Sequence, residues 1–399
     1  MAGTIATGPI STEEVLSDER VIDMDEKIRV LTPDDTQFTT MTSRLTSRQA
    51  IREKVNWLEE EDFPRVVSSA SAALSTDTAI PLTAGQGKVL QPNDMLRNMR
   101  TGEAALVVSI ATDTATVTRH VGNVPAAAVN SGDVWLVVGD AQPQGSDFPT
   151  ARYLARVLGW NYTEITRTPW TFTGTQTAIE LYGGREPAKE AVRAARVHKK
   201  KWESIGFFGA RSFTAASVAP NGNGEPQGSA GGMLEYIQTF KRDANGPLTP
   251  TFFDQLLADE MQYGSENKVL FAAPAVVQNM SGWNRSGMGA QWDPGGDRNV
   301  YGVKVDAFIS GAYGYRIPVV VKKEWAAFPT ANKGFGGYAF LIDMDYVERR
   351  PLRDRDTKLI TEQQPKGKDI YAAEYFTEAT YEIAQERAHA IIFGVTPPP

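Results

Sequence analysis

A long run of alternating residues near the end of the 399-residue chain limits its fold more than any other feature. From residue 370 to residue 383, one set of alternate positions is aromatic, apolar or threonine: Tyr371, Ala373, Tyr375, Thr377, Ala379, Tyr381 and Ile383. Glutamates occupy the other set at Glu374, Glu378 and Glu382. A period of two residues predicts a β-strand, which at about 3.3 Å per residue would be about 46 Å long. Because strands of compact domains usually have about five or six residues, this pattern favours a flattened, interlocking subunit over a compact enzyme.

The composition excludes several classes of protein. Hydrophobic residues make up 41% and charged residues 22% of the chain, which is typical of a folded soluble protein. The chain has no cysteine, so disulfides, thiolate nucleophiles and cysteine metal sites are excluded. Its longest apolar stretch, residues 269–277, is too short to span a membrane, and no signal-peptide pattern opens the sequence. We therefore expect a soluble protein that is made in the cytoplasm and has no membrane partner.

The net charge of −7 is concentrated at the N-terminal end of the chain. Residues 1–62 contain seven Lys and Arg against fourteen Asp and Glu, whereas residues 63–399 contain 34 of each kind. A sequence-specific DNA-binding protein usually has a clustered basic surface and a high pI, but the pI of this chain is about 5.3. Tight nucleic-acid binding is therefore disfavoured, and weak, non-specific contact with DNA is left open.

The first third of the chain predicts an acidic arm followed by a small all-β module. Residues 12–16 have the pattern of a short helix start. The Thr- and Ser-rich residues 36–47 are expected to form an arm rather than part of a core. Three β-rich runs follow at 104–110, 114–121 and 134–138, separated by turn residues. We interpret this region as a β-module inserted into a larger fold.

A long basic helix is predicted over residues 186–205. Its apolar positions form one narrow, alanine-rich stripe that ends at Trp202 and Ile205. Residues 185–201 contain seven Lys and Arg against two Glu, and a face of this kind usually pairs with acidic neighbours, which the acidic arm supplies. The glycine-rich stretch at 220–232 is expected to be a loop or hinge.

The second half of the chain predicts a mixture of helices and strands. The expected elements are a helix over 250–263, a strand over 269–277 leading into a helix that begins near Pro274, strands over 301–317, 319–321 and 338–344, and a glycine-rich turn at 332–337. This mixture indicates an α/β region that follows the basic helix and precedes the long strand.

No set of residues has the spacing of a catalytic or metal site. The histidines His120, His198 and His389 lie in different segments, and we interpret them as surface or capping residues. Asp343 and Asp345 share one face of a predicted strand, but two carboxylates are a small part of a Ca²⁺ or Mg²⁺ site. The sequence contains no Gly-x-Ser-x-Gly motif and no Walker loop. It therefore predicts no catalytic residue, no metal site and no cofactor.

The order of these parts resembles that of the major capsid proteins of tailed double-stranded DNA phages, whose subunit has the Johnson fold. Three segments carry the resemblance: VNWLEEEDFP at 55–64, NYTEITRTPWTFTGT at 161–175, and RDRDTKLITEQQPKGKDIYAAEYFTEATYEIAQERAHAIIFGV at 353–395. They follow one another in the same order as in that family, and together with the parts between them they cover nearly the whole chain.

The resemblance implies an α+β fold, the phage major capsid (Johnson) fold, in four parts. These are an acidic N-terminal arm at 1–67, an extended loop containing the small β-module at 68–160, a peripheral domain at 161–249 and 339–399, and an axial domain at 250–338. The peripheral domain would contain the spine helix of about 186–205 and the long strand of about 370–384.

The resemblance also implies a structural role and no enzymatic activity. Copies of the chain, arranged as pentamers and hexamers, would close into the icosahedral head shell of the virion after assembly in the host cytoplasm. The shell would enclose packaged double-stranded DNA and touch it only weakly. A portal protein and possible scaffolding and decoration proteins are the other partners that this function implies.

The candidate inter-subunit contacts are mostly charged. The four consecutive acids at residues 59–62 could hold a cation, but they are more typical of a solvated run or an ionic docking site. The candidate contact residues are Glu59, Glu60, Glu61, Arg119, Arg193, Arg196, Lys200 and Trp202. Two other functions stay open: a non-catalytic virion decoration, tail or carbohydrate-binding module, and a hydrolase acting through Asp343, Asp345 and Glu348.

Overall fold

The computed structural model describes residues 35–45, 47–179, 186–215, 224–285, 307–311 and 313–398. The chain forms two compact units: Met1–Trp57 together with Gly159–Pro399, here called the body, and Leu58–Leu158, here called the inserted unit. It passes between them in strands β1 (Lys54–Glu59) and β8 (Val157–Tyr162), which pair with each other. The helix start expected at 12–16 and the first part of the strand expected at 301–317 lie outside the described residues.

The inserted unit is built on one six-stranded antiparallel sheet with the strand order β2-β7-β4-β5-β6-β3. The strands are β2 (Val66–Ser68), β3 (Ala79–Pro81), β4 (Asp94–Asn98), β5 (Ala104–Ala111), β6 (Thr114–Thr118) and β7 (Val134–Asp140). A bridge between Ser69 and Leu82, directly after the two edge strands, closes the sheet on itself. The small all-β module and its three expected strands are therefore confirmed.

Alternation along the strands explains the interior of the inserted unit. In β6, Ala115 and Val117 are buried, whereas the threonines beside them are more exposed. Trp135 on β7 is fully buried and donates its indole N–H to Ser69 Oγ at 3.0 Å. The apolar side of the closed sheet thus surrounds one large aromatic side chain whose polar atom is satisfied.

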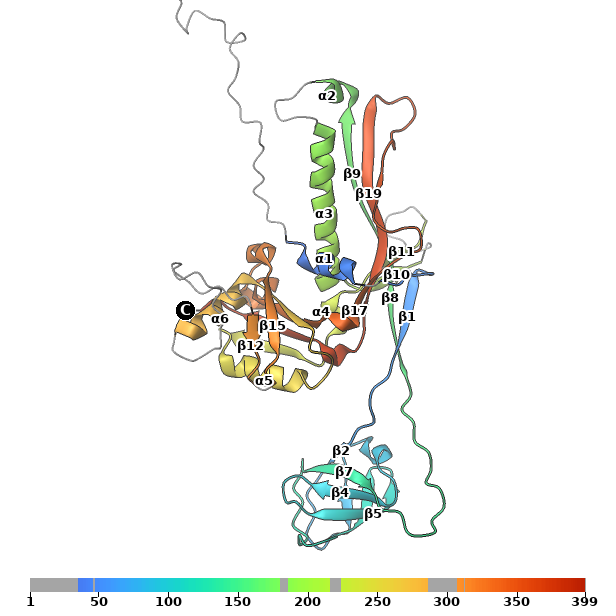
Figure 1. Ribbon diagram of the computed structural model, residues 1–399, viewed down its shortest axis with the longest axis vertical. Helices are drawn as coiled ribbons and strands as arrows, with labels where there is room; N and C mark the ends of the chain where they lie inside the picture. The colour runs from blue at the N-terminus through green and yellow to red at the C-terminus, as the bar shows by residue number, and fades with distance from the viewer. Residues whose placement is uncertain are drawn as a thin grey trace, which may run out of the picture. The chain divides into compact units, whose positions relative to one another are not determined.

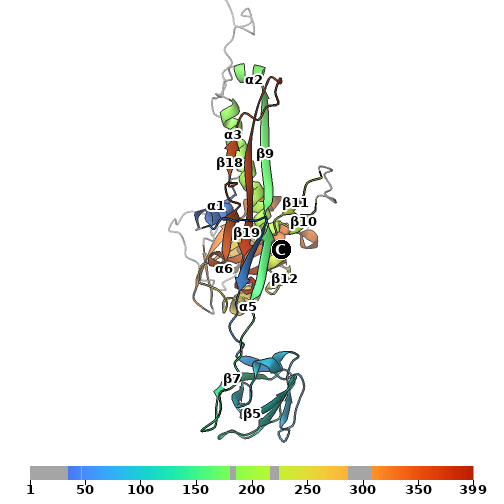
Figure 2. The ribbon, with the colours of Figure 1, turned by 90° about the vertical axis from the view of Figure 1, so that its right-hand side faces the viewer.

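The body contains a four-stranded sheet organised around one long strand (Figure 2). Strand β19 covers Ile370–Ile383, the same residues over which the alternation predicts a strand. Strand β9 (Glu164–Thr173) pairs with one edge of β19, and β17 (Val347–Pro351) and β18 (Lys358–Ile360) pair with the other. Helix α3 (Glu186–Phe208) lies alongside β9 and β19, and the short helix α2 (Gly174–Ala178) follows β9 (Figure 1).

Both faces of β19 are covered, which its alternation does not reveal. Glu374 and Glu378 are buried, although they lie opposite the mostly aromatic and apolar face. Arg167 on β9 donates to both carboxylate oxygens of Glu374, at 2.8 and 2.6 Å, and Arg355 donates to Glu378. Pairing with arginine allows the strand to keep glutamates at buried positions.

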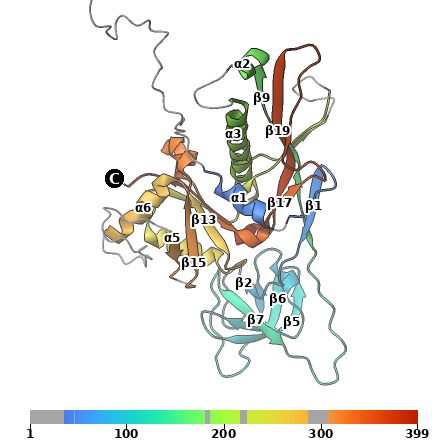
Figure 3. The same cartoon turned by 45° about the horizontal axis from the view of Figure 1, so that its top comes forward.

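A second, six-stranded mixed sheet lies in the main core of the body (Figure 3). Its strands, in spatial order, are β12 (Lys241–Gly246), β20 (Ala390–Val395), β16 (Ala339–Asp343), β13 (Lys268–Ala272), β15 (Arg316–Val321) and β14 (Ala307–Ile309). Helices α4 (Met233–Tyr236), α5 (Pro250–Glu260) and α6 (Pro274–Arg285) contribute to the same core. Every residue of β13 and β16 is buried, which explains why residues 269–272 and 339–342 are continuous apolar runs.

Several predicted boundaries differ by a few residues from the observed ones. The apolar stretch at 269–277 divides into a strand and a helix that begins at Pro274, as expected, because proline fits the first turn of a helix. Helix α5 ends at Glu260, three residues before its predicted end. The turn expected at 332–337 consists of two short 3₁₀ turns, Ala331–Lys333 and Phe335–Gly337.

The expectation that residues 36–47 form an arm outside the core is wrong. Gln37–Arg44 forms helix α1, and its Phe38 side chain is fully buried. The carboxylate of Glu203 on α3 accepts hydrogen bonds from the backbone N–H groups of Phe38 and Thr39, at 2.9 and 2.7 Å. It satisfies donors at the start of α1 that have no partner within the helix. This partner lies 165 positions from Phe38, so no local sequence pattern records it.

The buried face of α3 is turned relative to the predicted apolar stripe. Val192, which the stripe pattern predicts to be apolar-facing, is 56% exposed, whereas Ala194 and His198, outside the stripe, are buried. His198 lies between Thr168 and Thr377, with its ring nitrogens 3.1 and 2.8 Å from their hydroxyl oxygens. Because a satisfied polar residue occupies this face, a search for apolar periodicity misses it.

The described part of the glycine-rich stretch is packed, and the hinge interpretation is wrong for it. Strand β11 (Gln227–Ser229) pairs with β10 (Ser212–Thr214). The N–H of Gly232 donates to the carbonyl of Gly209 at 2.8 Å, and a Cβ on Gly232 would lie 2.4 Å from the Ile205 carbonyl oxygen. Glycine is required here because two backbone segments approach each other directly.

Candidate assembly surfaces

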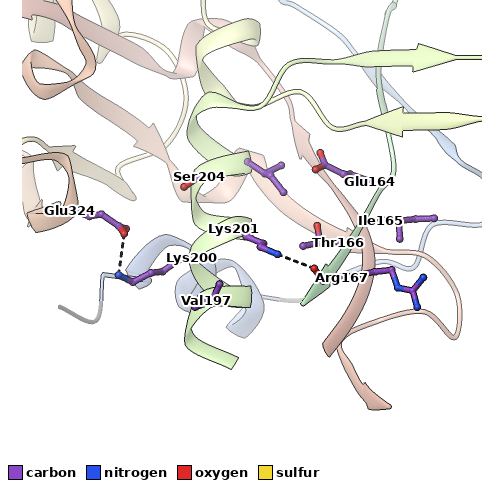
Figure 4. A pocket seen from close by; sticks show the side chains of 10 residues that line it. Glu164, Ile165, Thr166, Arg167, Val197, Lys200, Lys201, Ser204 and Glu324 are labelled. Atoms are coloured by element: carbon purple, nitrogen blue, oxygen red, sulfur yellow. Dashed lines mark hydrogen bonds and ion pairs between the residues drawn. The ribbon is translucent and has the colours of Figure 1, made fainter. Parts of the chain in front are cut away.

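A groove of about 640 Å³ lies between α3 and β9 in the body (Figure 4). Two exposed apolar side chains line it, Ile165 from β9 and Val197 from α3, with exposed fractions of 52% and 43%. Lys200 of α3 and Glu324 form an ion pair of 3.1 Å at the groove, which Figure 4 shows. The groove therefore combines apolar surface with charged side chains, as a surface that binds a polypeptide segment would.

The charge around the groove is mainly positive. Helix α3 contains six Lys and Arg against three Glu, and the groove follows its second half. Lys201 Nζ donates to the Arg167 carbonyl at 2.9 Å and to Thr168 Oγ1 at 3.1 Å. Glu164 also lines the groove, where it accepts a hydrogen bond from Ala230 N at 3.0 Å, and burial raises the pKa of its carboxyl.

The first half of α3 presents two of the candidate contact residues to solvent. The side chain of Arg193 is 77% exposed and lies 3.6 Å from Glu190, and Arg196 is also exposed. Lys200 is more restricted, with a side chain that is 16% exposed and paired with Glu324. The structure thus places Arg193 and Arg196 where another molecule can reach them.

The acidic run lies where the chain enters the inserted unit. Glu59 is the last residue of β1 and is half-buried, whereas Glu60 and Glu61 are exposed. Glu60 pairs with Arg156 at 3.0 Å, and both side chains are more than 60% exposed. An exposed pair of this kind contributes at most about 1 kcal/mol, so it leaves the carboxylate able to exchange partners.

The segment that leads out of the inserted unit exposes large apolar side chains. Phe148 is fully exposed, Tyr153 is 88% exposed, and Val157 and Leu158 are each more than half exposed. Exposed apolar side chains that gather in one segment mark interaction surfaces. These side chains were not among the predicted contacts, although aromatic residues in a Gly-, Pro- and Ser-containing stretch without a strand pattern are a signal of such a surface.

Two candidate contact residues are buried, and their predicted contact role is wrong. The side chain of Arg119 is 6% exposed and donates to both carboxylate oxygens of Glu103, at 2.5 and 2.6 Å. Its other N–H groups donate to backbone carbonyls of the inserted unit. Trp202 is 2% exposed in the main core of the body. Each of the two residues stabilises the unit to which it belongs. The sequence alone does not show which charged or aromatic side chains are buried in the folded chain.

The interpretation of the histidines as surface or capping residues is confirmed for the exposed His120 and wrong for the other two. Burial lowers the pKa of His198 to about 4 and the pKa of His389 to about 3. Nδ1 of His389 accepts a hydrogen bond from Asp343 N at 3.1 Å, so Nε2 carries the proton and faces the Ala384 carbonyl at 3.2 Å. Both buried rings are neutral at pH 7 and act as core residues.

The carboxylates of the hydrolase alternative are engaged in local structure. Asp343 is fully buried and accepts hydrogen bonds from Ser265 N, Ser265 Oγ and Asp345 N at 2.5, 2.7 and 3.1 Å. Asp345 accepts one from Asn267, and Glu348 forms an ion pair within β17. Among the residues that the structure describes, no group of three or more His, Asp or Glu is placed to hold a metal ion. Within these same ranges, no helix combines the length and the apolar character needed to cross a membrane.

Several known proteins with similar sequences or structures are phage proteins. The profile of a family described as SU10 major capsid protein matches residues 4–396. A major capsid protein of Pseudomonas phage PaMx41 is 27% identical over 194 residues, which cover 47% of this chain and 45% of that relative, slightly less than half of its length. A solved structure of Gordonia phage Cozz is 8% identical and covers 100% of both chains with a TM-score of 0.50, which shows a shared fold. The capsid of Myoviridae phage XM1 is 9% identical and covers 98% of this chain and 100% of that chain with a TM-score of 0.47.

Proposed function

Because the chain belongs to the SU10 major capsid protein family, we propose that many copies of it assemble into the icosahedral head shell that encloses and protects packaged double-stranded DNA. The family consists of structural virion proteins, so the prediction of a non-enzymatic phage capsid protein is confirmed. The observation in this chain that best supports assembly is the exposure of Phe148 and Tyr153 in the inserted unit.

These two side chains supply apolar surface that favours contact between subunits. An aromatic side chain buries about 150–250 Å² when it is fully covered. At about 25 cal/mol per Å², each ring contributes about 4–6 kcal/mol before the entropy of association is subtracted. In water such surface favours association, and a second copy of the chain is the partner that a self-assembling shell provides.

We assign the four parts predicted from the sequence to roles in the shell. The extended loop at 68–160 reaches over a neighbouring subunit, and the peripheral domain at 161–249 and 339–399 supplies the spine helix and the long strand. The axial domain predicted at 250–338 meets its symmetry mates in pentamers and hexamers, and strands β12, β16 and β20 of the same sheet extend it beyond these bounds. The N-terminal part at 1–67 precedes these parts and carries most of the net negative charge, and within it Gln37–Arg44 forms helix α1 of the body.

The proposed ionic contact between copies joins the acidic run to the first half of α3. Glu59, Glu60 and Glu61 of one copy would face Arg193 and Arg196 of the next, and all except the half-buried Glu59 are exposed. Each exposed ion pair is worth about 0–1 kcal/mol, so the contact gains strength only by repetition around a closed shell. The apolar contact of the inserted unit would supply most of the free energy.

Other partners follow from the proposed role. The shell would be assembled in the host cytoplasm, would include a portal protein, and could use scaffolding and decoration proteins. Residues 63–399 carry equal numbers of positive and negative side chains. A neutral inner surface would hold DNA only by weak, non-specific contact, since tight phosphate binding requires clustered cations.

Sedimentation velocity of paired variants tests the proposal. We expect the purified chain to sediment as capsomer-sized or larger species, and the double variant Phe148→Ser with Tyr153→Ser to sediment as a monomer. A control with Leu74→Ser and Met99→Ser removes apolar side chains of the same unit that are 66% and 57% exposed, and should keep assembling. A chain that is monomeric at every concentration would contradict assembly by the chain alone and favour a binding module.

A further inference from the structure

The groove between α3 and β9 lies beside the point where the described part of the body begins. The carboxylate of Asp35 accepts a hydrogen bond from Glu324 N at 2.9 Å. Glu324 lines the groove and pairs with Lys200. The 34 residues that precede Asp35 therefore start within one residue's reach of the groove.

This starting point is firmly anchored to α3. Lys322 Nζ lies 3.2 Å from Asp35 Oδ1 and donates to the Asp35 carbonyl at 2.9 Å. The same ammonium group donates to Glu203 on α3 at 2.6 Å. All three side chains are less than 5% exposed. A segment tethered in this way has an effective concentration at the groove on the order of millimolar.

The preceding segment and the helix carry complementary charge. Residues 1–34 contain eight Asp and Glu against three Lys and Arg, a net charge of −5. Helix α3 contains six Lys and Arg against three Glu, a net charge of +3. Residues 1–34 also contain nine Ile, Leu and Val, which match the exposed Ile165 and Val197 of the groove.

We propose that residues 1–34 of the chain bind in the groove between α3 and β9 of the same subunit. Acidic side chains face Lys200 and Lys201, and apolar side chains cover Ile165 and Val197. Length is no obstacle: 34 extended residues reach about 110 Å, whereas the 23 residues of α3 measure about 35 Å. The inference does not depend on shell assembly, and it leaves Arg193 and Arg196, in the first half of α3, for other contacts.

The absence of cysteine from the chain allows a direct test by crosslinking. The full chain with Val197→Cys is labelled with a photoreactive maleimide, and crosslinked peptides are identified by mass spectrometry. The control Leu359→Cys places the label on β18 at a matched exposure, 47% against 43%. Mixing chains labelled with ¹⁴N and ¹⁵N distinguishes products within one chain from products between chains.

We expect crosslinks from position 197 to residues 1–34 of the same chain and none to that segment from position 359. At about 1 µM protein, products within one chain should outnumber mixed-isotope products by about a thousandfold, because the tethered segment is present at about millimolar concentration. Crosslinks to residues 59–62 of another copy, mainly mixed-isotope products, or equal yields at both positions would overturn the proposal.

Charge reversal in the segment provides a second test. Replacing Glu13, Glu14, Asp18 and Glu19 by lysine should abolish the crosslink from position 197, because it makes the segment positive. Exchanging Glu and Asp at the same four positions retains the charge and should retain the crosslink. Hydrogen-exchange protection of β19 verifies that each variant is folded. A crosslink that survives the charge reversal would contradict the ionic part of the proposal.

Discussion

One group of buried ion pairs in the body and one buried ion pair in the inserted unit connect segments at very different separations in the sequence. In the body, Lys322 contacts Glu203 at 2.6 Å and Asp35 at 3.2 Å, and these partners lie 119 and 287 positions away in the sequence. In the inserted unit, Arg119 pairs with Glu103, only 16 positions earlier, at 2.5 Å. All of these side chains are less than 10% exposed.

The difference shows how much of the chain each unit needs in order to fold. The carbonyl groups that Arg119 contacts and the strands that close the sheet all belong to residues 58–158. The body instead joins its first described residues to α3 and to the 3₁₀ turn at Lys323–Ala327 through one lysine. Removing the ion pair of Arg119 should therefore destabilise the inserted unit alone, whereas removing the ion pairs of Lys322 should destabilise several segments of the body together.

The largest effect is expected from removing the charge at Lys322. The variant Lys322→Met leaves two buried carboxylates, Asp35 and Glu203, without their cationic partner, and should lower the free energy of unfolding by about 3–5 kcal/mol. Urea unfolding measures this change in free energy. Lys333→Met is the control, because Lys333 is 54% exposed and its pair with Asp243 should be worth at most about 1 kcal/mol. Equal losses in both variants would remove the distinction between buried and exposed pairs.

The variant Arg119→Met is expected to destabilise the inserted unit by about 3 kcal/mol, because Glu103 keeps a buried charge without its partner. Hydrogen exchange should show faster exchange in β5 and β6 and unchanged protection in β19. If β19 also lost protection, the two units would be energetically coupled, and the comparison between local and long-range folding would fail.

Acidification is expected to weaken the body through its buried histidines. The pKa of His389 is about 3 in the folded state, against about 6.5 when the chain is unfolded, so the unfolded state binds more protons below pH 6.5. Stability from this group is complete above pH 6.5 and decreases as the pH falls, by about 2 kcal/mol at pH 5. His389→Gln should make the unfolding free energy less dependent on pH between 7 and 5 by this amount.

A buried carboxyl in the same unit acts in the opposite direction. Burial raises the pKa of Glu260 to about 7, so its contribution to stability is complete below its unfolded pKa of about 4.5 and is lost as the pH rises through 7. The histidine effect must therefore be taken as the difference between wild type and variant. A difference that does not change with pH would show that His389 is protonated in the folded state as readily as in the unfolded state.

The smallest effect on stability is expected at the exposed acidic run. Glu60→Gln removes one surface ion pair and should change the free energy of unfolding by less than about 1 kcal/mol. The same variant should reduce assembly at low salt and low protein concentration, where the ionic contact is least screened, if the acidic run contacts a neighbouring copy. Urea unfolding and sedimentation of the same sample separate the two effects, and a large loss of stability would show that Glu60 has a structural role.

Local sequence patterns predicted those helices and strands in which buried and exposed residues follow a regular period. Strand β19 spans the predicted residues, and the β-module was recognisable from its strands and turns. Helix α1 was missed because its stabilising partner, Glu203, lies far away in the sequence. The buried glutamates of β19 could not be predicted either, since their arginine partners come from other segments.

The candidate surface was predictable only in part. Glu60, Glu61, Arg193 and Arg196 are on the surface, as contacts between copies require. Arg119 was not, because the sequence does not distinguish an arginine that a carboxylate covers from one that faces water. The exposed aromatic side chains of the inserted unit were not predicted either. An apolar residue is expected to be buried, and the sequence alone does not show that these lie on the surface.

Electron microscopy of the purified full chain, over a series of protein and salt concentrations, tests the central claim most directly. If the chain is the shell subunit, negative-stain images should show closed shells or rings of capsomer size, and their proportion should rise with protein concentration. A uniform population of single subunits under every condition would contradict the account.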